Sequence, residues 1–337
     1  MSVTKKIDTT KIKKILVIQL KPFGDVLLTT AYFETLKNKL PQAKLYYLVK
    51  EPFQEIVANH PFIDEIIAIK KEKGLKYAVQ RIKIIKKIRR EKFDLVIDQQ
   101  NMPSSQQLTL LSGAKLRVGY ADARFSFVYN IKAKRGKMQY SASRKYELLA
   151  PLGIGEEPYK LYFPIKHEAH EYIENWASKQ KSDLKKLICI SPGSPVKSKI
   201  WNLENYAQLA DSIHDKLGYK VVLSWAPQEL KYVEIVRSKM KTIPIVAPST
   251  DLCQAAALLT RCKLLICNDG GLNHLSVATG TTTLAIFGST SPEVWSPASV
   301  FPHHFHLHNP NWERNSQNDF GISFEEVFEQ VKKILAQ

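Results

Sequence analysis

The 337-residue sequence has few cysteines and no arrangement of them that builds a site. The four present include no Cys-x-x-Cys pair: Cys189, Cys253, Cys262 and Cys267. A zinc site or a thioredoxin-like redox centre therefore has no support, and so few cysteines in so long a chain do not form a disulfide framework. Buried thiols in a reducing compartment are the simplest interpretation, so we expect a cytoplasmic protein.

Long hydrophobic runs are also missing. No apolar stretch approaches the roughly 18 residues that a transmembrane helix needs, and the apolar run after the basic N-terminal segment is too short for a signal peptide. We therefore expect any membrane contact to be peripheral. Acidic residues are scarce relative to basic ones, 32 against 49, which gives a net charge of +17. Such a balance favours an anionic partner: nucleic acid, a membrane surface or a phosphorylated substrate.

Two common nucleotide-binding signatures are absent as well. No strand-like run is followed by Gly-x-Gly-x-x-Gly, which disfavours a nicotinamide dehydrogenase, and the chain contains no Asp-x-Asp motif. The histidines at positions 303, 304, 306 and 308 have no acidic or cysteine partner nearby in the sequence. We expect a polar surface strand or loop there and assign no metal ligand.

Apolar runs alternate with helical apolar spacing through both halves of the chain. The runs predict strands at 14–20, 45–49, 63–69, 94–98, 187–191, 220–225, 243–247, 263–268 and 283–288. This alternation predicts two Rossmann-like, doubly wound α/β domains facing across a cleft. We place them at residues 1–165 and 166–322, with the linker within 150–185 and an amphipathic, capped helix at 323–337.

A first candidate site follows the strand expected at 14–20. Gly24 permits a tight turn there, and Asp25 falls in the first turn of the helix expected at 25–40. A first-turn aspartate can simply complement the helix dipole. It can also be a general base that takes a proton from a substrate hydroxyl. The spacing alone leaves both interpretations open.

A second candidate follows the strand expected at 187–191. The turn at 191–194 (SPGS) exposes backbone N–H groups and the hydroxyl of Ser194, and Lys197 and Lys199 stand close enough to meet phosphate charge. A solvated loop with incidental lysines is equally compatible. Trp201 is expected to pack and fix the loop rather than to stack on a ligand.

A third candidate is the segment 268–274 (NDGGLNH), between a strand and a helix that begins near 271. Its two glycines leave the helix N-terminus open to close approach, which favours a diphosphate. Asp269 can contact a sugar hydroxyl or orient the loop. His274 can donate to a phosphate or be a satisfied histidine near the domain surface.

Two further segments can be interpreted either as functional sites or as ordinary structural features. The loop at 287–292 (FGSTSP) is either another anion-facing loop or an ordinary helix cap. The stretch 70–92 carries 11 basic and 2 acidic residues, and Ile82, Ile85 and Ile88 predict an inward apolar side. Its remaining surface is either a solvated charged face or a docking face for lipid head groups or a phosphorylated acceptor. The basic residues concerned are Lys83, Lys86, Lys87, Arg89 and Arg90.

Three segments together resemble one known family: 14–49 (KILVIQLKPFGDVLLTTAYFETLKNKLPQAKLYYLV), 190–211 (ISPGSPVKSKIWNLENYAQLAD) and 264–292 (LLICNDGGLNHLSVATGTTTLAIFGSTSP). Over about residues 13–310 the chain is similar to the ADP-heptose:lipopolysaccharide heptosyltransferases, glycosyltransferase family 9. The Gly-Asp-Val-Leu and Asp-x-Gly-Leu-x-His segments are the specific part. The GDVLLTT form and YELLAPLGI (146–154) look closest to the heptosyltransferase III-like branch, which adds heptose to an inner-core heptose.

The resemblance implies a GT-B fold and inverting, metal-independent transfer, with the acceptor on the first domain and ADP-heptose on the second. Asp25 matches the proposed catalytic base, Lys199 the lysine that meets the donor phosphates, and Ser194 a hydroxyl residue of the same loop. The donor-binding turn is matched by Asp269, Gly270, Gly271 and His274. Gly270 stands where many members carry Thr, so a hydroxyl contact to phosphate is expected to be lost.

The implied partners are the nucleotide-sugar donor, the anionic lipopolysaccharide core and, peripherally, the inner face of the inner membrane, with neither nucleic acid nor a cofactor. Charge supports this division, because residues 1–180 hold 33 basic and 18 acidic residues, whereas residues 181–337 hold 16 and 14. One alternative is a GT-B transferase or epimerase that uses another nucleotide sugar. The other is a basic module that binds membrane or nucleic acid, which leaves the loops after the strands unexplained.

Overall fold

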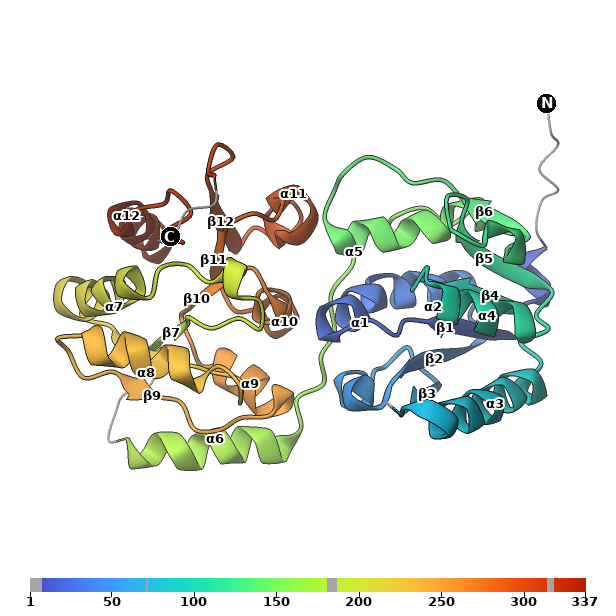
Figure 1. Ribbon diagram of the computed structural model, residues 1–337, viewed down its shortest axis with the longest axis horizontal. Coiled ribbons are helices and arrows are strands. Elements are labelled where there is room, and N and C mark those ends of the chain that lie inside the picture. The colour runs from blue at the N-terminus through green and yellow to red at the C-terminus, as the bar shows by residue number, and fades with distance from the viewer. Residues whose placement is uncertain (1–7, 71, 181–186, 314–317) are drawn as a thin grey trace. The chain divides into compact units, whose positions relative to one another are not determined.

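The computed structural model describes residues 8–70, 72–180, 187–313 and 318–337. It divides into two compact units, Met1–Pro164 and Ile165–Gln337, each built around a parallel six-stranded sheet (Figure 1). Among the described residues, no helix combines the length and the apolarity needed to cross a membrane.

The sheet of the first unit has the order β3-β2-β1-β4-β5-β6, and all neighbouring strands run parallel. Its strands are β1 (Lys14–Ile18), β2 (Lys44–Lys50), β3 (Glu65–Ile69), β4 (Leu95–Asp98), β5 (Leu116–Tyr120) and β6 (Ile131–Ala133). The four expected strands are confirmed. The strands β5 and β6 have no counterpart among them, because each is short and interrupts its apolar residues with a basic one.

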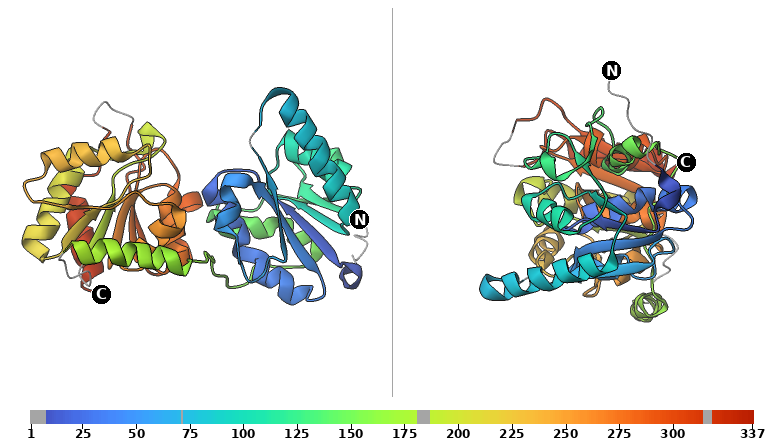
Figure 2. Two further views of the ribbon diagram at one scale, coloured as in Figure 1. Left: turned by 90° about the horizontal axis from the view of Figure 1, so that it is seen from below. Right: turned by 90° about the vertical axis from the view of Figure 1, so that its right-hand side faces the viewer.

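Helices cover both faces of this sheet (Figure 2). One face is covered by two helices that bury Ile84, Ile88 and Leu108 against the strands. On the other face, the rings of Phe33 and Tyr47 meet edge to face with centroids 5.0 Å apart. The helix expected at 25–40 is broken by a 3-10 turn into α1 and α2. The helices are α1 (Phe23–Thr29), α2 (Phe33–Lys39), α3 (Gly74–Glu91), α4 (Pro103–Leu111) and α5 (Ser141–Arg144).

The expected inward side of the basic helix, α3, is wrong in one respect. Ile84 and Ile88 are buried and Ile85 packs beside them, but Ile82 is 53% exposed. At about 100° per residue, Ile82 points roughly 160° away from Ile84. The three-residue spacing of 82, 85 and 88 drifts around the helix, and the inward line runs instead through 81, 84 and 88.

The sheet of the second unit has the order β12-β11-β10-β7-β8-β9, again with all neighbouring strands parallel. Its strands are β7 (Leu187–Ser191), β8 (Lys220–Leu223), β9 (Ile245–Val246), β10 (Leu264–Asn268), β11 (Thr283–Phe287) and β12 (His304–His308). The five strands expected in this half are confirmed, and the histidine-rich segment adds β12 at the edge.

Seven helices of the described residues belong to the second unit: α6 (His167–Lys179), α7 (Leu203–Leu217), α8 (Leu230–Lys239), α9 (Leu252–Leu259), α10 (Gly271–Thr279), α11 (Pro292–Trp295) and α12 (Phe324–Leu335). The helix α12 starts with the expected capping box of Ser323 and Glu326 and packs against α7. The helix α6 lies within the expected linker but packs against α9. Residues 181–185 of that linker lie outside the described residues.

Candidate functional site

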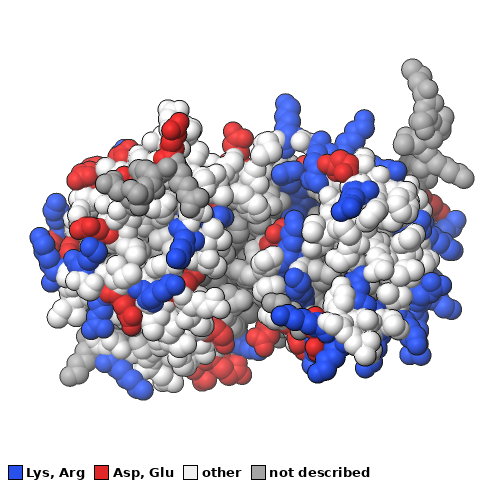
Figure 3. Space-filling view, viewed as in Figure 1, with Lys and Arg blue, Asp and Glu red and all other residues white. Residues whose placement is uncertain are grey.

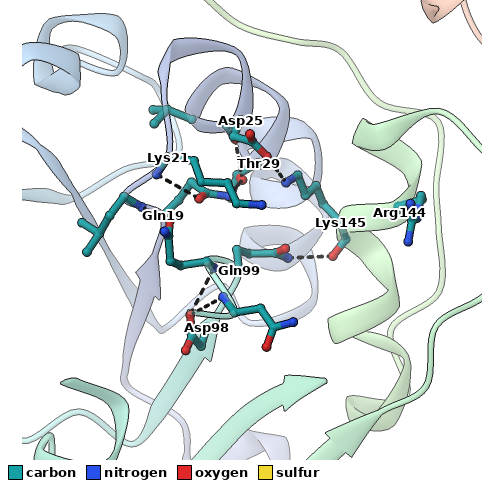
Figure 4. A network of polar contacts seen from close by, with 12 residues as sticks. Gln19, Lys21, Asp25, Thr29, Asp98, Gln99, Arg144 and Lys145 are labelled. Carbon is teal, nitrogen blue, oxygen red and sulfur yellow. Dashed lines mark hydrogen bonds and ion pairs between the residues drawn. The ribbon is translucent and has the colours of Figure 1, made fainter. Parts of the chain in front are cut away.

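The first unit gathers polar side chains at the carboxyl end of β1. The chain leaves β1 at Ile18 and enters α1 at Phe23, so Asp25 lies in the first helical turn, as expected. Its carboxylate accepts a hydrogen bond from the ammonium of Lys145, with Oδ1 and Nζ 3.0 Å apart (Figure 4). The side chain of Asp25 is 18% exposed and that of Lys145 is 9% exposed. The carboxylate is therefore held by a cation and still reachable by a substrate.

Lys145 opens a 3-10 turn, η5 (Lys145–Leu148), that follows α5. Burial lowers the pKa of its ammonium, and the neighbouring Asp25 carboxylate opposes that change. The amide of Gln99, just past β4, donates to the main-chain oxygen of Lys145 at 2.8 Å. The sequence gives no local sign of this role, because only the folded sheet brings Lys145 to a partner 120 positions away.

A buried network fixes the start of α1 on the strand before it. The amide of Gln19 donates to the hydroxyl of Thr29 at 3.2 Å, and that hydroxyl donates to the main-chain oxygen of Asp25 at 2.7 Å (Figure 4). Both Gln19 and Thr29 are fully buried. The network thus sets the main chain from which the Asp25 carboxylate projects.

A second carboxylate of this region, Asp98, has a structural role. It is fully buried at the end of β4 and accepts hydrogen bonds from the Tyr129 hydroxyl at 2.8 Å and from the main-chain N–H of Gln100. Burial raises the pKa of Asp98 to about 6. Because its oxygens are occupied inside the unit, Asp25 is the better candidate for proton transfer to a substrate.

The second unit brings together the loops that follow β7, β10 and β11. The ammonium of Lys199 donates to Oδ2 of Asp269 at 2.6 Å, and the hydroxyl of Thr290 donates to the same oxygen at 2.8 Å. The side chain of Asp269 is 4% exposed, whereas that of Lys199 is 27% exposed. One buried carboxylate therefore anchors a cation that remains partly open to solvent. The 287–292 loop contributes to this site through Thr290.

Asn268, the last residue of β10, holds the loop after β7 in place. Its Oδ1 accepts from the main-chain N–H of Trp201 at 2.9 Å and from the Tyr206 hydroxyl at 3.0 Å, and its Nδ2 donates to the main-chain oxygen of Pro192 at 3.0 Å. The indole of Trp201 is fully buried and donates to the main-chain oxygen of Ile322. Trp201 is a packing residue, as expected.

The turn at 191–194 lies against a carboxylate that no sequence motif marks, Glu229. A Cβ on Gly193 would come within 2.7 Å of the Glu229 Cβ, so a glycine is needed there. Burial raises the pKa of Glu229. Ser194 is itself buried, and its hydroxyl oxygen accepts the main-chain N–H of Val196 at 3.2 Å. A carboxylate beside this turn is suited to accept hydrogen bonds from sugar hydroxyls.

The helix α10 starts directly after Asp269. Gly270 is its N-cap, has extended main chain and provides no side-chain cap, and Gly271 is the first helical residue. A Cβ at Gly270 would meet no atom closer than 3.9 Å. His274 is 4% exposed and lies beside Trp295, with ring centroids 6.2 Å apart. The first-turn N–H groups and the positive end of the helix dipole therefore lie next to the Lys199–Asp269 pair.

The cations expected to dock an acceptor or a membrane lie along α3 in the first unit. All five are exposed: Lys83, Lys86, Lys87, Arg89 and Arg90. None of them takes part in an ion pair found within the described residues. These five side chains therefore place positive charge on the surface of the first unit.

The histidine-rich segment forms an edge strand, β12, as expected, but one of its histidines is not at the surface. His304 is 5% exposed, and burial lowers its pKa to about 4. His306 lies with Nδ1 2.9 Å from the hydroxyl of Ser296. Within the described part of the chain, no three His, Cys, Asp or Glu side chains come together in a group that could hold a metal ion.

The two parallel sheets, each with polar loops at the carboxyl ends of its strands, define a two-domain α/β protein of the GT-B class. The chain belongs to glycosyltransferase family 9 (heptosyltransferase), whose model matches residues 81–321. It is therefore a glycosyltransferase, and the resemblance found in the sequence is confirmed.

Individual relatives agree with this family. The chain is 24% identical over 295 residues to lipopolysaccharide heptosyltransferase 3 of Escherichia coli, covering 82% of this chain and 84% of that one. A glycosyl transferase family 9 structure from Veillonella parvula DSM 2008 superposes with a TM-score of 0.86 at 26% identity, over 98% and 99% of the two chains. The E. coli ADP-heptose lps heptosyltransferase II gives 0.79 at 22% identity, over 96% and 99%. They confirm the expected fold.

Proposed function

We propose that this glycosyltransferase moves heptose from ADP-L-glycero-D-manno-heptose to the inner core of lipopolysaccharide and inverts the anomeric configuration. The observation that carries the proposal is the Lys199–Asp269 pair at the N-terminus of α10, in a chain of family 9. A cation beside uncapped N–H groups suits the diphosphate of a nucleotide sugar. The names of the E. coli relatives support the choice of donor and acceptor.

The reaction is a single displacement. The acceptor oxygen attacks the anomeric carbon while its proton passes to the carboxylate of Asp25. The bond between that carbon and the phosphate oxygen breaks, and ADP leaves with the bonding electrons. Lys199 and the N-terminus of α10 offset the negative charge that grows on the diphosphate. Because these groups supply the charge stabilisation, we expect transfer to proceed in the presence of EDTA.

The remaining roles follow from the neighbouring side chains. Ser194 and the main-chain N–H groups at Gly270 and Gly271 bind the donor phosphates, with His274 as a further donor, and Glu229 accepts hydrogen bonds from a hydroxyl of the donor. The acceptor binds to the first unit beside Asp25, where the excess of Lys and Arg complements the phosphates of the core. Contact with the inner membrane is peripheral, and nucleic acid is not a partner.

A nucleotide titration tests the donor. Calorimetry with ADP, UDP and GDP, each in the presence of EDTA, should show selective binding of ADP. A preference for UDP or GDP, or binding that needs added metal, would contradict the proposal that the donor is an ADP sugar bound without metal. Conversion of the sugar nucleotide without any acceptor would identify an epimerase instead.

Lys145 is expected to position Asp25 and favour its ionised form. Lys145→Met should lower kcat/KM by at least about tenfold and move the acid limb of its pH profile to higher pH, because the base loses its neighbouring cation. Lys145→Arg keeps the charge and should keep the limb in place. An unchanged pH profile in a folded Lys145→Met protein would show that the pair only stabilises the unit.

Gly270 offers room for the hydroxyl that many members of the family carry. Its extended main chain accommodates any residue, and a Cβ there meets nothing closer than 3.9 Å. Gly270→Thr should therefore bind ADP about threefold to tenfold more tightly, the size of one added hydrogen bond. Gly270→Ala is the matched control without a hydroxyl. Equal affinities for the Thr and Ala variants would contradict a phosphate at this position.

A further inference from the structure

Exposed large apolar side chains of the first unit gather on one layer of its structure. Among the described residues, Met138 and Tyr162 are the exceptions. The others lie on α3, around α4 and within the segment 125–128, which includes the 3-10 turn η4 (Ser126–Val128). They are Leu75, Tyr77, Val79, Ile82, Met102, Leu110, Phe125 and Phe127. We call the surface formed by these residues the α3–α4 face.

The α3–α4 face is continuous. The helices α3 and α4 pack against each other on the same side of the sheet, and the guanidinium of Arg81 joins them by donating to the main-chain oxygen of Ser104. The helix α4 in turn contacts η4, and an apolar groove of about 450 Å³ between them is lined by Leu110, Phe125 and Phe127. One connected surface therefore carries aliphatic and aromatic groups.

The outer side of α3 contributes an apolar stripe. Leu75 is 82% exposed, and Val79 and Ile82 follow at the four- and three-residue steps that share one helical face. This stripe lies opposite Ile84 and Ile88, which pack on the sheet. Figure 2 shows α3 at the margin of the first unit, with no other element drawn over its outer side. Leu75, Val79 and Ile82 are therefore among the described apolar side chains that the packing of the first unit leaves exposed.

The same layer is strongly basic. Residues 73–130 contain twelve Lys and Arg against four Asp and Glu. Of these acids, Glu91 is paired with Lys14, Asp122 is paired with Arg135, and Asp98 is buried. Figure 3 shows Lys and Arg side chains crowded along the part of the first unit that α3 forms. The apolar stripe is therefore flanked by cations that outnumber the acids of the same layer.

We propose that the α3–α4 face docks on an anionic phospholipid bilayer. Leu75, Val79, Ile82 and Phe127 enter the boundary between head groups and acyl chains, and the lysines and arginines of α3 lie on the head-group phosphates. A helix with an apolar stripe between cationic flanks is suited to lie in this plane. Nucleic acid would use the cations but has no place for exposed aliphatic side chains.

The position of the face fits the reaction. The helix α3 begins after β3, so Leu75 lies toward the carboxyl edge of the sheet, where Asp25 also lies. Docking would present that edge to sugars anchored at the bilayer surface. This catalytic benefit of docking rests on the proposed function, because it requires an acceptor that is linked to a lipid.

Vesicle sedimentation tests the docking without any substrate. We expect the protein to bind vesicles of phosphatidylcholine mixed with phosphatidylglycerol, to bind pure phosphatidylcholine weakly, and to be released by salt. The triple change Lys83→Ser, Lys86→Ser and Arg90→Ser should weaken binding about a hundredfold. The matched control removes three exposed lysines of the second unit (Lys179→Ser, Lys241→Ser and Lys333→Ser) and should bind as the wild type does.

The apolar part of the proposal has its own test. Val79→Ser, Ile82→Ser and Phe127→Ser combined should also weaken vesicle binding at least about tenfold, since inserted apolar area is lost. The exposed Ile243→Ser in the second unit is the control. Equal binding by the apolar triple variant, or binding to duplex DNA as strong as to the mixed vesicles, would overturn bilayer docking.

A spectroscopic readout locates the contact. All five tryptophans lie beyond residue 164, so Phe127→Trp adds the first reporter to the first unit. Its added fluorescence should shift to the blue and be quenched by brominated lipids, whereas a tryptophan placed by Ile243→Trp should not respond. A response at 243 without one at 127 would place the contact elsewhere and contradict the proposal.

Transfer to a delipidated core oligosaccharide separates the two claims. The apolar triple variant should keep wild-type kcat with this acceptor and lose activity only with acceptor embedded in vesicles. Failure of the wild type to modify any core acceptor would contradict the proposed function and leave the vesicle result intact. Equal activity of the variant on embedded acceptor would contradict a catalytic benefit from docking.

Discussion

Asp25→Asn is expected to reduce kcat by at least about a thousandfold while ADP binding stays unchanged. Asparagine keeps the size of the side chain and an oxygen that can accept from Lys145, but it cannot take the proton of the acceptor hydroxyl. General-base catalysis contributes about 10² to 10⁴ in rate. Binding of ADP is expected to survive because the groups proposed to hold it belong to the second unit.

Two measurements decide this prediction: transfer rate and calorimetric ADP affinity. Asp122→Asn is the matched control, because Asp122 is an exposed acid of the same unit that pairs with Arg135; it should keep full activity. Substantial activity in Asp25→Asn would remove Asp25 as the base. A protein that loses its cooperative thermal unfolding would show that the Asp25–Lys145 pair is needed for the fold.

The second large effect is expected at Lys199. Lys199→Met should weaken ADP binding and slow transfer, each by about tenfold to a hundredfold, because a charge-assisted contact to phosphate is lost. The neighbouring Lys197 is exposed in the same loop, so Lys197→Met is the control and should behave as the wild type does. Unchanged affinity and rate in Lys199→Met would remove Lys199 from the donor site.

Lys199 also neutralises the charge of Asp269, so its removal is expected to lower stability as well as ADP binding. A double variant separates these two effects. Removing the cation leaves a carboxylate that is 4% exposed with the Thr290 hydroxyl still donating to it. We expect a loss of about 1–3 kcal/mol of stability, less than for a fully buried pair because Lys199 still meets water. Adding Asp269→Asn should restore the melting temperature and leave ADP binding weak. Restored binding in the double variant would mean that Lys199 acts only on the fold.

The sheets and the loops that carry the candidate residues were predictable from local sequence. Buried parallel strands read as continuous apolar runs, and β1 (KILVI), β7 (LICIS) and β10 (LLICN) stand out for that reason. Polar and glycine residues directly after such runs mark the strand ends, where ligands bind in sheets of this kind. Asp25, Lys199 and Asp269 were therefore singled out.

Residues that act from a distance were not predictable in this way. Lys145 reaches Asp25, and Glu229 lies beside Gly193, only because separate parts of each unit fold together. Neither has a local motif, and a single sequence contains no record of which distant side chains meet. Their proximity depends on tertiary packing.

The basic helix α3 shows a different limit of prediction from sequence: which side of a helix faces the core. A repeat of three isoleucines indicated one inward side, yet Ile82 faces solvent and Ile84 faces the core. Helical spacing identifies a helix, but it does not fix which residues face inward. A helix has about 3.6 residues per turn, so residues that repeat every three positions move gradually around it. The exposed stripe on which the docking proposal depends could be identified only from the structure.

The most direct test of the central claim is transfer itself. Purified protein is incubated with ADP-L-glycero-D-manno-heptose, EDTA and a series of truncated lipopolysaccharide cores, and the products are measured by mass spectrometry and anomeric NMR. We predict the gain of one heptose on a core that lacks it, equimolar release of ADP, and an anomeric configuration opposite to that of the donor. A retained configuration, a strict need for added metal, or turnover of the donor without any acceptor would contradict the account.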